Sequence, residues 1–407
     1  MTYTVPSWID GAEHTHAESF PVVAPSTGEP CWMAASASPD DALRAVEAAS
    51  SALPAWRSTK PTTRQSILLK AALLMEERAD ELCGYMQTEM GADAFVARWI
   101  VLQLGINMFR DCASRAPGIC GSVPTVQAEG QSAMVWKEPY GVVLGIVPCL
   151  EVIGVDASVL LGLGAAAELA RVMVEHPAVR KVNFTGSATV GRKVACLCSQ
   201  NLKPVLLELG GKNSAIVLPD ADLEKAAKAC IMGALPMLGK SACLPIACLS
   251  TPTSKLSSCE SSRIVLQQPK QRTKGAQVLS GGPPPSGPAA HFIPTVIGKL
   301  SKEMEAYKEE NFGPLMGWVT VKSEEEAIAI ANNSGYGLSA SIFTQDLRKG
   351  FAMARKLETG AVHINSMTVH DETALPFGGI NRSGWGRFNA AEGMEEFLVT
   401  KSVTWDD

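Results

Sequence analysis

The sequence predicts an α/β fold built on a largely parallel sheet. Segments with helical periodicity alternate along the chain with short apolar segments typical of buried strands, and glycines stand at several junctions between them. The composition agrees, because 46% hydrophobic and 19% charged residues are typical of a globular protein with a large core. A length of 407 residues allows two or three domains.

The first half of the chain opens with helical patterns over residues 39–90. Within them Leu68, Ala72, Leu73 and Met75 fall near one stripe, which we expect to face the core. The segment 132–148 then indicates two strands about a turn at 138–141. Residues 179–198 indicate a strand, a glycine turn and the start of a helix.

The second half continues the alternation. Residues 203–218, "KPVLLELGGKNSAIVL", indicate two buried strands around Gly210 and Gly211, and a helix follows over 220–234. The stretch 233–255, "GALPMLGKSACLPIACLSTPTSK", interrupts the pattern with prolines, cysteines, serines and threonines. Strand–helix–strand order returns over 309–346, and residues 395–405 indicate a closing strand.

Charge and cysteine content exclude several classes of protein. A net charge of −5, with no domain carrying a basic surplus, argues against nucleic acid as a partner. The first residues lack the pattern of a secretory signal, and the longest apolar run, 157–167, is broken by glycine and too short to span a bilayer. The 11 cysteines form no disulfide framework or zinc spacing, and we expect Cys196 and Cys198 on two sides of a helix end. We therefore expect a cytoplasmic protein without a membrane partner.

Two segments carry residues suited to catalysis beside a nucleotide. In "FTGSATVG", Gly186 and Gly191 follow a strand and precede a helix, where backbone N–H groups and the helix dipole favour a phosphate; a plain tight turn is the alternative. In "LELGGK", Glu208 ends a buried strand, and an unpaired buried carboxylate is costly. Burial would raise its pKa toward neutrality, as a general base requires. A structural ion pair is the alternative.

Further candidates lie in the second half. In "EENFGPL", Glu310 and Phe312 would point the same way on a strand. There Glu310 could hydrogen-bond a ribose hydroxyl and Phe312 could pack against a flat ring; a surface Glu and a core Phe are the alternative. "LPFGGINRSGWGR" is a glycine-dense loop that contains Phe377. Asn365 and two histidines stand nearby in "AVHINSMTVHD", and we expect those histidines to be satisfied core or loop residues.

Taken together and in this order, these motifs resemble the aldehyde dehydrogenase superfamily. "WIDG", "FTGS", "LELGGK", "EENFGPL", "YGLSASIFT" and "LPFGGINRSGWGR" carry the resemblance from residue 8 to 387. "INSMTVHD" and "GWGRF" look most like its salicylaldehyde and vanillin dehydrogenase branch. The resemblance implies a Rossmann-type cofactor domain (1–121 and 140–208, incomplete), an α/β catalytic domain (209–390) and oligomerisation strands (122–139 and 391–407).

The resemblance also implies a reaction and its residues. A cysteine thiolate attacks the aldehyde, hydride passes to a nicotinamide, and a base-activated water releases the carboxylic acid. Glu208 matches the base, and Phe377 matches a position near the substrate pocket. The cofactor-binding residues that it implies are Gly186, Ser187, Gly191, Leu209, Glu310 and Phe312. The implied cofactor is NAD, with NADP not excluded.

The nucleophile is the first departure from the family pattern. The family places it one helix after "LELGGK", in a string such as N-A-G-Q-V-C-L-S-T-D-R, where this chain has the stretch 233–255. Joining the last nucleotide of each codon to the first two of the next, from Pro236 to Lys255, permits N-A-G-Q-V-C-L-S-T-D-R-V-L-V-H-A-D-I-K. We therefore expect residues of about 237–259 to be a frame-shifted translation. The nearest thiol in the chain as written is Cys243, which is our candidate nucleophile.

The second departure follows "GIVP". Cys149, Leu150 and Glu151 stand where the family has Trp-Asn, and the segment that would hold the adenosine-binding lysine is missing. The function that the resemblance implies is NAD(P)-dependent oxidation of an aromatic or aliphatic apolar aldehyde to its carboxylic acid, by a homodimer or homotetramer. The alternative is an aldehyde-dehydrogenase-like protein impaired or inactivated by these departures. A hydrolase is a distant third hypothesis, because no Ser/His/Asp arrangement is visible.

Overall fold

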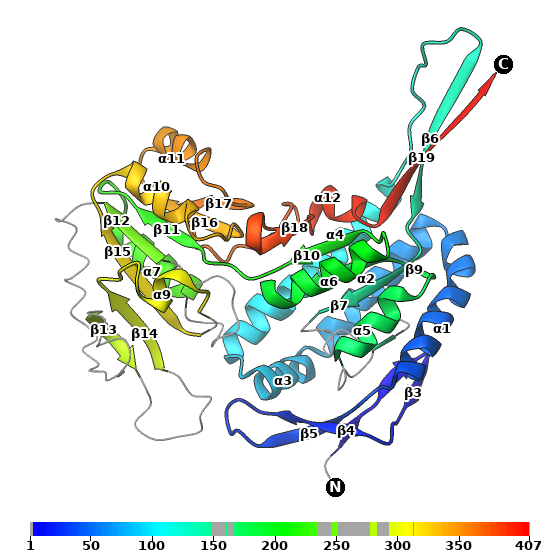
Figure 1. The fold of residues 1–407 in the computed structure, drawn as a ribbon, viewed down its shortest axis with the longest axis horizontal. Helices are drawn as coiled ribbons and strands as arrows, with labels where there is room; N and C mark the ends of the chain where they lie inside the picture. Colours follow the sequence, from blue (N-terminus) through cyan, green and yellow to red (C-terminus); the bar gives the residue numbers. More distant parts are fainter. Residues whose placement is uncertain are drawn as a thin grey trace.

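The computed structural model describes residues 3–147, 159–160, 166–234, 246–250, 277–282, 293–311 and 313–406. Its strands form five sheets. Figure 1 shows two bodies side by side, one around β7, β9 and β10 and the other around β11, β12 and β15, with a two-stranded arm extending from the first. The α/β fold expected from the sequence is confirmed.

The N-terminal segment forms two small sheets beside the first body. One has the order β1-β5-β4 (Thr4–Val5, Pro30–Ala35, Ser19–Val23), and the other β3-β2-β8 (Ala12–His14, Ser7–Ile9, Val159–Leu160). A turn at Asp10-Gly11, both with positive φ, joins β2 to β3. These sheets lie at the edge of the molecule, away from the arm (Figure 1).

Helices follow over the region where the sequence predicts them. They are α1 (Pro39–Ser58), α2 (Pro61–Glu77), α3 (Ala79–Met90), a π-helix (Val96–Leu102), α4 (Gln103–Arg115) and a 3₁₀ turn (Ala116–Gly118). Ser38 and Asp41 cap α1 reciprocally. The predicted apolar stripe is right for Ala72 and Met75, which are buried, and wrong for Leu73, which is 52% exposed. Ala72 and Met75 pack in one cluster with Ile106 of α4, and Leu73 lies outside this cluster.

The first body contains a four-stranded sheet in the order β18-β10-β9-β7 (Gly384–Trp385, Val205–Glu208, Val179–Thr185, Val142–Ile146). β7, β9 and β10 are parallel, and β18 is antiparallel to β10. Helices α5 (Ala166–Glu175) and α6 (Ala188–Gln200) pack on it. In α6 Cys196 is exposed and Cys198 buried, as predicted.

The second body contains a seven-stranded sheet in the order β13-β14-β15-β12-β11-β16-β17 (Gln277–Gly282, Ile293–Gly298, Leu315–Val321, Ile246–Ser250, Ser214–Val217, Ser339–Phe343, Ala361–Ile364). Every neighbouring pair is parallel except β13–β14. In the described residues, the helices of this part are α7 (Leu223–Ala234), α9 (Glu305–Lys308), α10 (Glu324–Asn332) and α11 (Leu347–Ala354).

The arm pairs β6 (Gln131–Pro139) with β19 (Leu398–Asp406), antiparallel along their whole lengths. A 3₁₀ turn (Asn381–Ser383) and α12 (Ala390–Glu395) lead into β19. Figure 1 shows the arm protruding with the C-terminus at its tip. Met134, Trp136, Val399 and Trp405 on the arm are each at least 39% exposed. No helix in the described ranges is both long and apolar enough to cross a membrane.

Candidate active site

Glu208 lies at the carboxyl end of β10, opposite the end of β9. The two strands pair with Glu208 beside Thr185, whose Oγ1 donates a hydrogen bond to Glu208 Oε2 at 3.5 Å. Burial raises the pKa of Glu208 to about 7, and the nearby Asp371 carboxyl adds to the rise. A carboxyl that is half ionised at neutral pH can both accept and return a proton, as a general base must.

The turn after β9 is fixed to Glu208 through its backbone. Gly186 N–H donates to the Glu208 carbonyl at 3.0 Å, and Ser187 caps α6 by accepting from Val190 N–H at 3.3 Å. Gly191 belongs to the first turn of α6 and not to the loop, which corrects the expectation that both glycines precede the helix. A Cβ on Gly191 would lie 2.4 Å from Leu209 Cδ2, so the absence of a side chain lets α6 approach Leu209.

Glu310 reaches back to the same place from the second body. Gly211 N–H donates to Glu310 Oε1 at 2.9 Å, and a Cβ on Gly210 would lie 2.1 Å from Glu310 Oε2. Glu310 lies in an irregular segment after α9, not on a strand as predicted. Burial raises its pKa, while the Gly211 hydrogen bond, Lys212 and Arg382 oppose the rise. Its carboxylate therefore lies beside the chain segment that follows Glu208.

These residues fit a bound dinucleotide. Helix α6 begins just after the carboxyl end of β9, and a pyrophosphate binds at this place in folds of this type. The Glu310 carboxylate beside Gly211 is a hydrogen-bond acceptor for ribose hydroxyls. The Gly210–Lys212 segment that joins the two sheets lies between these groups.

The loop after β17 supplies a second, partly buried carboxyl. Asn389 Nδ2 donates to Asp371 Oδ1 at 2.6 Å, and burial raises the pKa of Asp371. The ring centroids of His363 and His370 lie 4.9 Å apart, and burial beside His370 lowers the pKa of His363 to about 4. His363 Nε2 is buried without a hydrogen-bond partner among the described residues, so the expectation of a satisfied histidine is wrong there.

Ser383 fixes this loop to the segment 209–213, which joins the two sheets. Its hydroxyl donates to the Gly210 carbonyl at 2.7 Å and accepts from Gly337 N–H at 3.0 Å, and its carbonyl accepts from Leu209 N–H at 3.0 Å. Phe377 pairs with Phe388 through two backbone hydrogen bonds, which close the loop between them. Asn365 bonds the backbone of Thr344 through both of its side-chain polar atoms, so it holds the chain in place.

Cys243 and Phe312 lie outside the described residues. Among the described cysteines with a shifted pKa, burial raises the pKa of Cys112, of Cys198 to about 11 and of Cys230 to about 12. A raised pKa disfavours the thiolate, so these three thiols do not fit a nucleophile.

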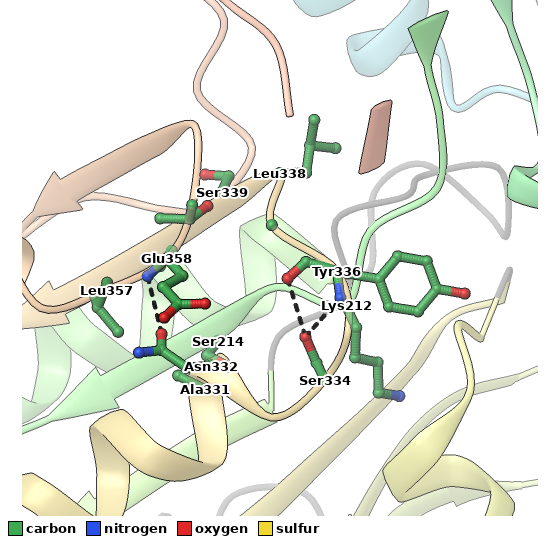
Figure 2. Close-up of a pocket in the computed structure, with 13 residues that line it drawn as sticks. Lys212, Ser214, Ala331, Asn332, Ser334, Tyr336, Leu338, Ser339, Leu357 and Glu358 are labelled. Carbon is green, nitrogen blue, oxygen red and sulfur yellow. Dashed lines mark hydrogen bonds between the residues drawn. The ribbon is translucent and has the colours of Figure 1, made fainter. Parts of the chain in front are cut away.

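Figure 2 shows a separate pocket, in the second body. Its lining includes Asn332, Ser334, Tyr336 and Glu358, with the stem of Lys212 at one side, and excludes Glu208 and Glu310. Asp371, Ser383 and Lys212 are the site residues that sequence reasoning missed. The signal for Ser383 and Lys212 lay in the motifs themselves, "NRSGWGR" and "LELGGK", whereas the approach of Asp371 to Glu208 is a tertiary contact.

Comparison with known proteins identifies the family. The sequence model of the "Aldehyde dehydrogenase family" matches residues 8–149, 148–246 and 256–403. The chain belongs to this family. It is 34% identical to the vanillin dehydrogenase of Pseudomonas fluorescens, with 93% of each chain covered. It is 30% identical to the salicylaldehyde dehydrogenase of Pseudomonas putida, covering 98% of this chain and 96% of the relative.

Solved structures agree with this assignment. The crystal structure of a salicylaldehyde dehydrogenase from Pseudomonas putida G7, complexed with salicylaldehyde, has a TM-score of 0.90 at 27% identity and covers 99% of this chain and 98% of that one. Aldehyde dehydrogenase is thus both the fold and the enzyme class of the chain. The named relatives oxidise aldehydes, and they lend no support to the alternative of an inactive protein.

Proposed function

We propose that this aldehyde dehydrogenase oxidises an aromatic aldehyde to its carboxylic acid, with NAD or NADP as hydride acceptor and Glu208 as the general base. The observation that carries the proposal is the Glu208 carboxyl, held at the carboxyl end of β10 with a pKa raised to about 7. Similarity to vanillin and salicylaldehyde dehydrogenases supports the aromatic substrate. Similarity to an NADP-dependent succinate-semialdehyde dehydrogenase keeps both cofactors open.

The residues of the site have separate tasks in this proposal. The start of α6, from Ser187 to Gly191, binds the pyrophosphate, with Leu209 packed behind it, and Glu310 accepts hydrogen bonds from the ribose. When bound, the nicotinamide supplies the hydride acceptor. Glu208 takes a proton from the water that attacks the acyl group on the nucleophile, and its buried carboxyl holds that proton until the acid leaves. Phe377 borders the aldehyde.

The nucleophile is Cys243 if the chain acts as written. We infer, however, that the codon of the ancestral cysteine is split between Ser241 and Ala242 by a frame shift over about 237–259, and that a segment after residue 148 is deleted. The family match supports this, because it restarts at residue 148 and omits 247–255. The alignment with vanillin dehydrogenase also extends over 460 positions, more than the 407 residues of this chain. Sequencing the transcript across residues 145–275 tests the inference. A transcript that encodes the sequence of this chain unchanged would refute an error in the gene model.

The activity is tested by following reduction of NAD and NADP with vanillin, salicylaldehyde and acetaldehyde. We expect reduction with the aromatic aldehydes, and a loss of about 10²–10⁴-fold in E208Q, because removing a general base costs that much. C243S should abolish the reaction if Cys243 is the nucleophile. A folded protein with an intact nucleophile segment that binds NAD yet reduces it with no aldehyde, or an E208Q variant with full activity, would contradict the proposal.

Assembly, location and domain limits complete the proposal. We propose a cytoplasmic homodimer or homotetramer that associates through the arm and binds neither nucleic acid nor membrane. The exposed apolar residues of β6 and β19 support association, because an uncovered edge strand is a hazard that proteins cover. The change of sheet between Glu208 and Ser214 supports a boundary at 208/209 between the cofactor domain (1–121 and 140–208) and the catalytic domain (209–390). The oligomerisation strands are 122–139 and 391–407.

A further inference from the structure

Lys212 is a buried cation between the two sheets. It is 5% exposed, and its ammonium donates to the Ala306 carbonyl at 2.7 Å. Figure 2 shows its side chain running away from Ser334 and Glu358, so the pocket there does not receive the charge. The catalytic roles proposed above leave this ammonium without a task.

The ammonium holds the short segment that presents Glu310. Ala306 belongs to α9, and Glu309, Glu310 and Asn311 follow it directly. Asn311 Nδ2 donates to the same Ala306 carbonyl at 3.3 Å. The residue before Lys212, Gly211, binds the Glu310 carboxylate through its N–H. Two consecutive residues therefore hold this segment in place. Lys212 binds α9 through its charged side chain, and Gly211 binds Glu310 through its backbone N–H.

We propose that Lys212 is a positioning residue for cofactor binding: while protonated, it fixes Glu310 against Gly211 in the place where the ribose is bound. The inference rests on the function proposed above and extends it. A charged donor makes a hydrogen bond roughly twice as strong as a neutral one, so loss of the proton loosens the hold on Ala306. It also removes a positive charge that attracts Glu310.

The charges around Lys212 place this change within reach of experiment. Burial lowers the pKa of Lys212 to about 8, and Glu310 and Glu309 oppose the lowering. Arg382 lies 3.9 Å from Glu309, and its guanidinium lies over the Tyr336 ring. Lys212 is therefore largely protonated at pH 7 and largely neutral at pH 9, where Glu208 is already ionised.

The test is the dissociation constant of NAD⁺, measured by tryptophan fluorescence from pH 6.5 to 9.5 and up to millimolar ligand. We expect the constant for the unaltered protein to rise about five- to tenfold through an inflection near pH 8. K212R keeps its charge throughout this range, so it should bind at pH 9 as at pH 7. K212M should bind about five- to tenfold more weakly than the unaltered protein at pH 7, with no inflection.

Two further measurements separate this role from general destabilisation. Lys203 is another lysine whose pKa burial lowers, and it bonds the Val174 and His176 carbonyls; K203R should keep the inflection. In an E310Q background, K212M should weaken binding much less than in the unaltered protein, because Lys212 acts through Glu310. An inflection that persists in K212R, additive effects of K212M and E310Q, or pH-independent binding would overturn the inference alone. Absence of any saturable NAD⁺ binding at pH 7 would overturn the proposed function with it.

Discussion

Replacing Asp371 by Asn tests why Glu208 is basic at neutral pH. Two physical causes raise its pKa, burial first and the Asp371 carboxyl second. The substitution removes the charge of Asp371 and keeps its shape and its ability to accept from Asn389. The pKa of Glu208 should therefore fall in D371N, yet stay above its ordinary value of 4.5 because the burial remains.

The size of the effect follows from the ionised fraction of Glu208. With a pKa of about 7, half of the carboxyls are ionised at pH 7 and about one in eleven at pH 6. The rate of a step that needs the carboxylate then falls about fivefold between these two pH values. A carboxyl near its ordinary pKa would lose almost nothing over the same interval. The D371N enzyme should lie between these limits, losing less than fivefold.

The assay is the pH profile of kcat from pH 5.5 to 8.5 with a saturating aromatic aldehyde. E372Q is the matched control, because Glu372 is the exposed neighbour of Asp371 and carries the same charge; its profile should equal that of the unaltered enzyme. An acidic inflection that stays at the same pH in D371N, or moves upward, would refute the assignment of Asp371 as the like-charged neighbour of Glu208.

Three further outcomes are expected. The E208Q protein should be more stable than the unaltered protein at pH 8, by up to about 3 kcal/mol, and equally stable below pH 4.5. The reason is that a carboxyl whose pKa is raised by folding loses its stabilising contribution as pH rises from 4.5 to 7. Urea unfolding at both pH values measures this difference. S383A should lower the free energy of unfolding by about 1–3 kcal/mol, because its two buried backbone partners lose a hydrogen bond, and an unchanged midpoint would contradict the bridging role. Truncation after Glu395 removes β19 and should convert an oligomer into monomer or aggregate; light scattering that gives a 43.1 kDa monomer for the full chain would refute assembly through the arm.

Local sequence signals predicted the fold well wherever periodicity and glycine turns agree. The strand before Gly186, the two strands around Gly210 and Gly211, and the closing strand β19 all form as expected. The sequence could not assign β10 and β11 to different sheets, because both are short apolar strands and their partners lie far along the chain. The same limit explains Leu73, whose exposure depends on which side of α2 receives α4.

Site residues were predictable to the extent that their chemistry is encoded locally. Glu208 could be singled out because a carboxylate at the end of an apolar strand is unusual, and burial does raise its pKa to about 7. The approach of Asp371 to Glu208, by contrast, joins residues more than 160 positions apart in the chain. The irregular backbone at Glu310 was also missed, because Gly210 must lack a side chain to admit the carboxylate and no local pattern shows that contact.

The location of these residues explains why a few short motifs hold so much of the site. Leaving the first sheet at Glu208 and entering the second at Ser214, the chain exposes backbone groups that neither sheet can satisfy. The Ser383 hydroxyl donates to the Gly210 carbonyl, and the Glu310 carboxylate accepts from Gly211 N–H. The Lys212 ammonium donates to a carbonyl of α9. Buried backbone groups must find hydrogen-bond partners. The motifs that contain Glu310 and Ser383 supply them to the segment 209–213, and they therefore lie close to Glu208. The same contacts connect the chain segment after Glu208 to the Glu310 carboxylate, so changes at Lys212 or Ser383 should weaken cofactor binding as well as alter stability.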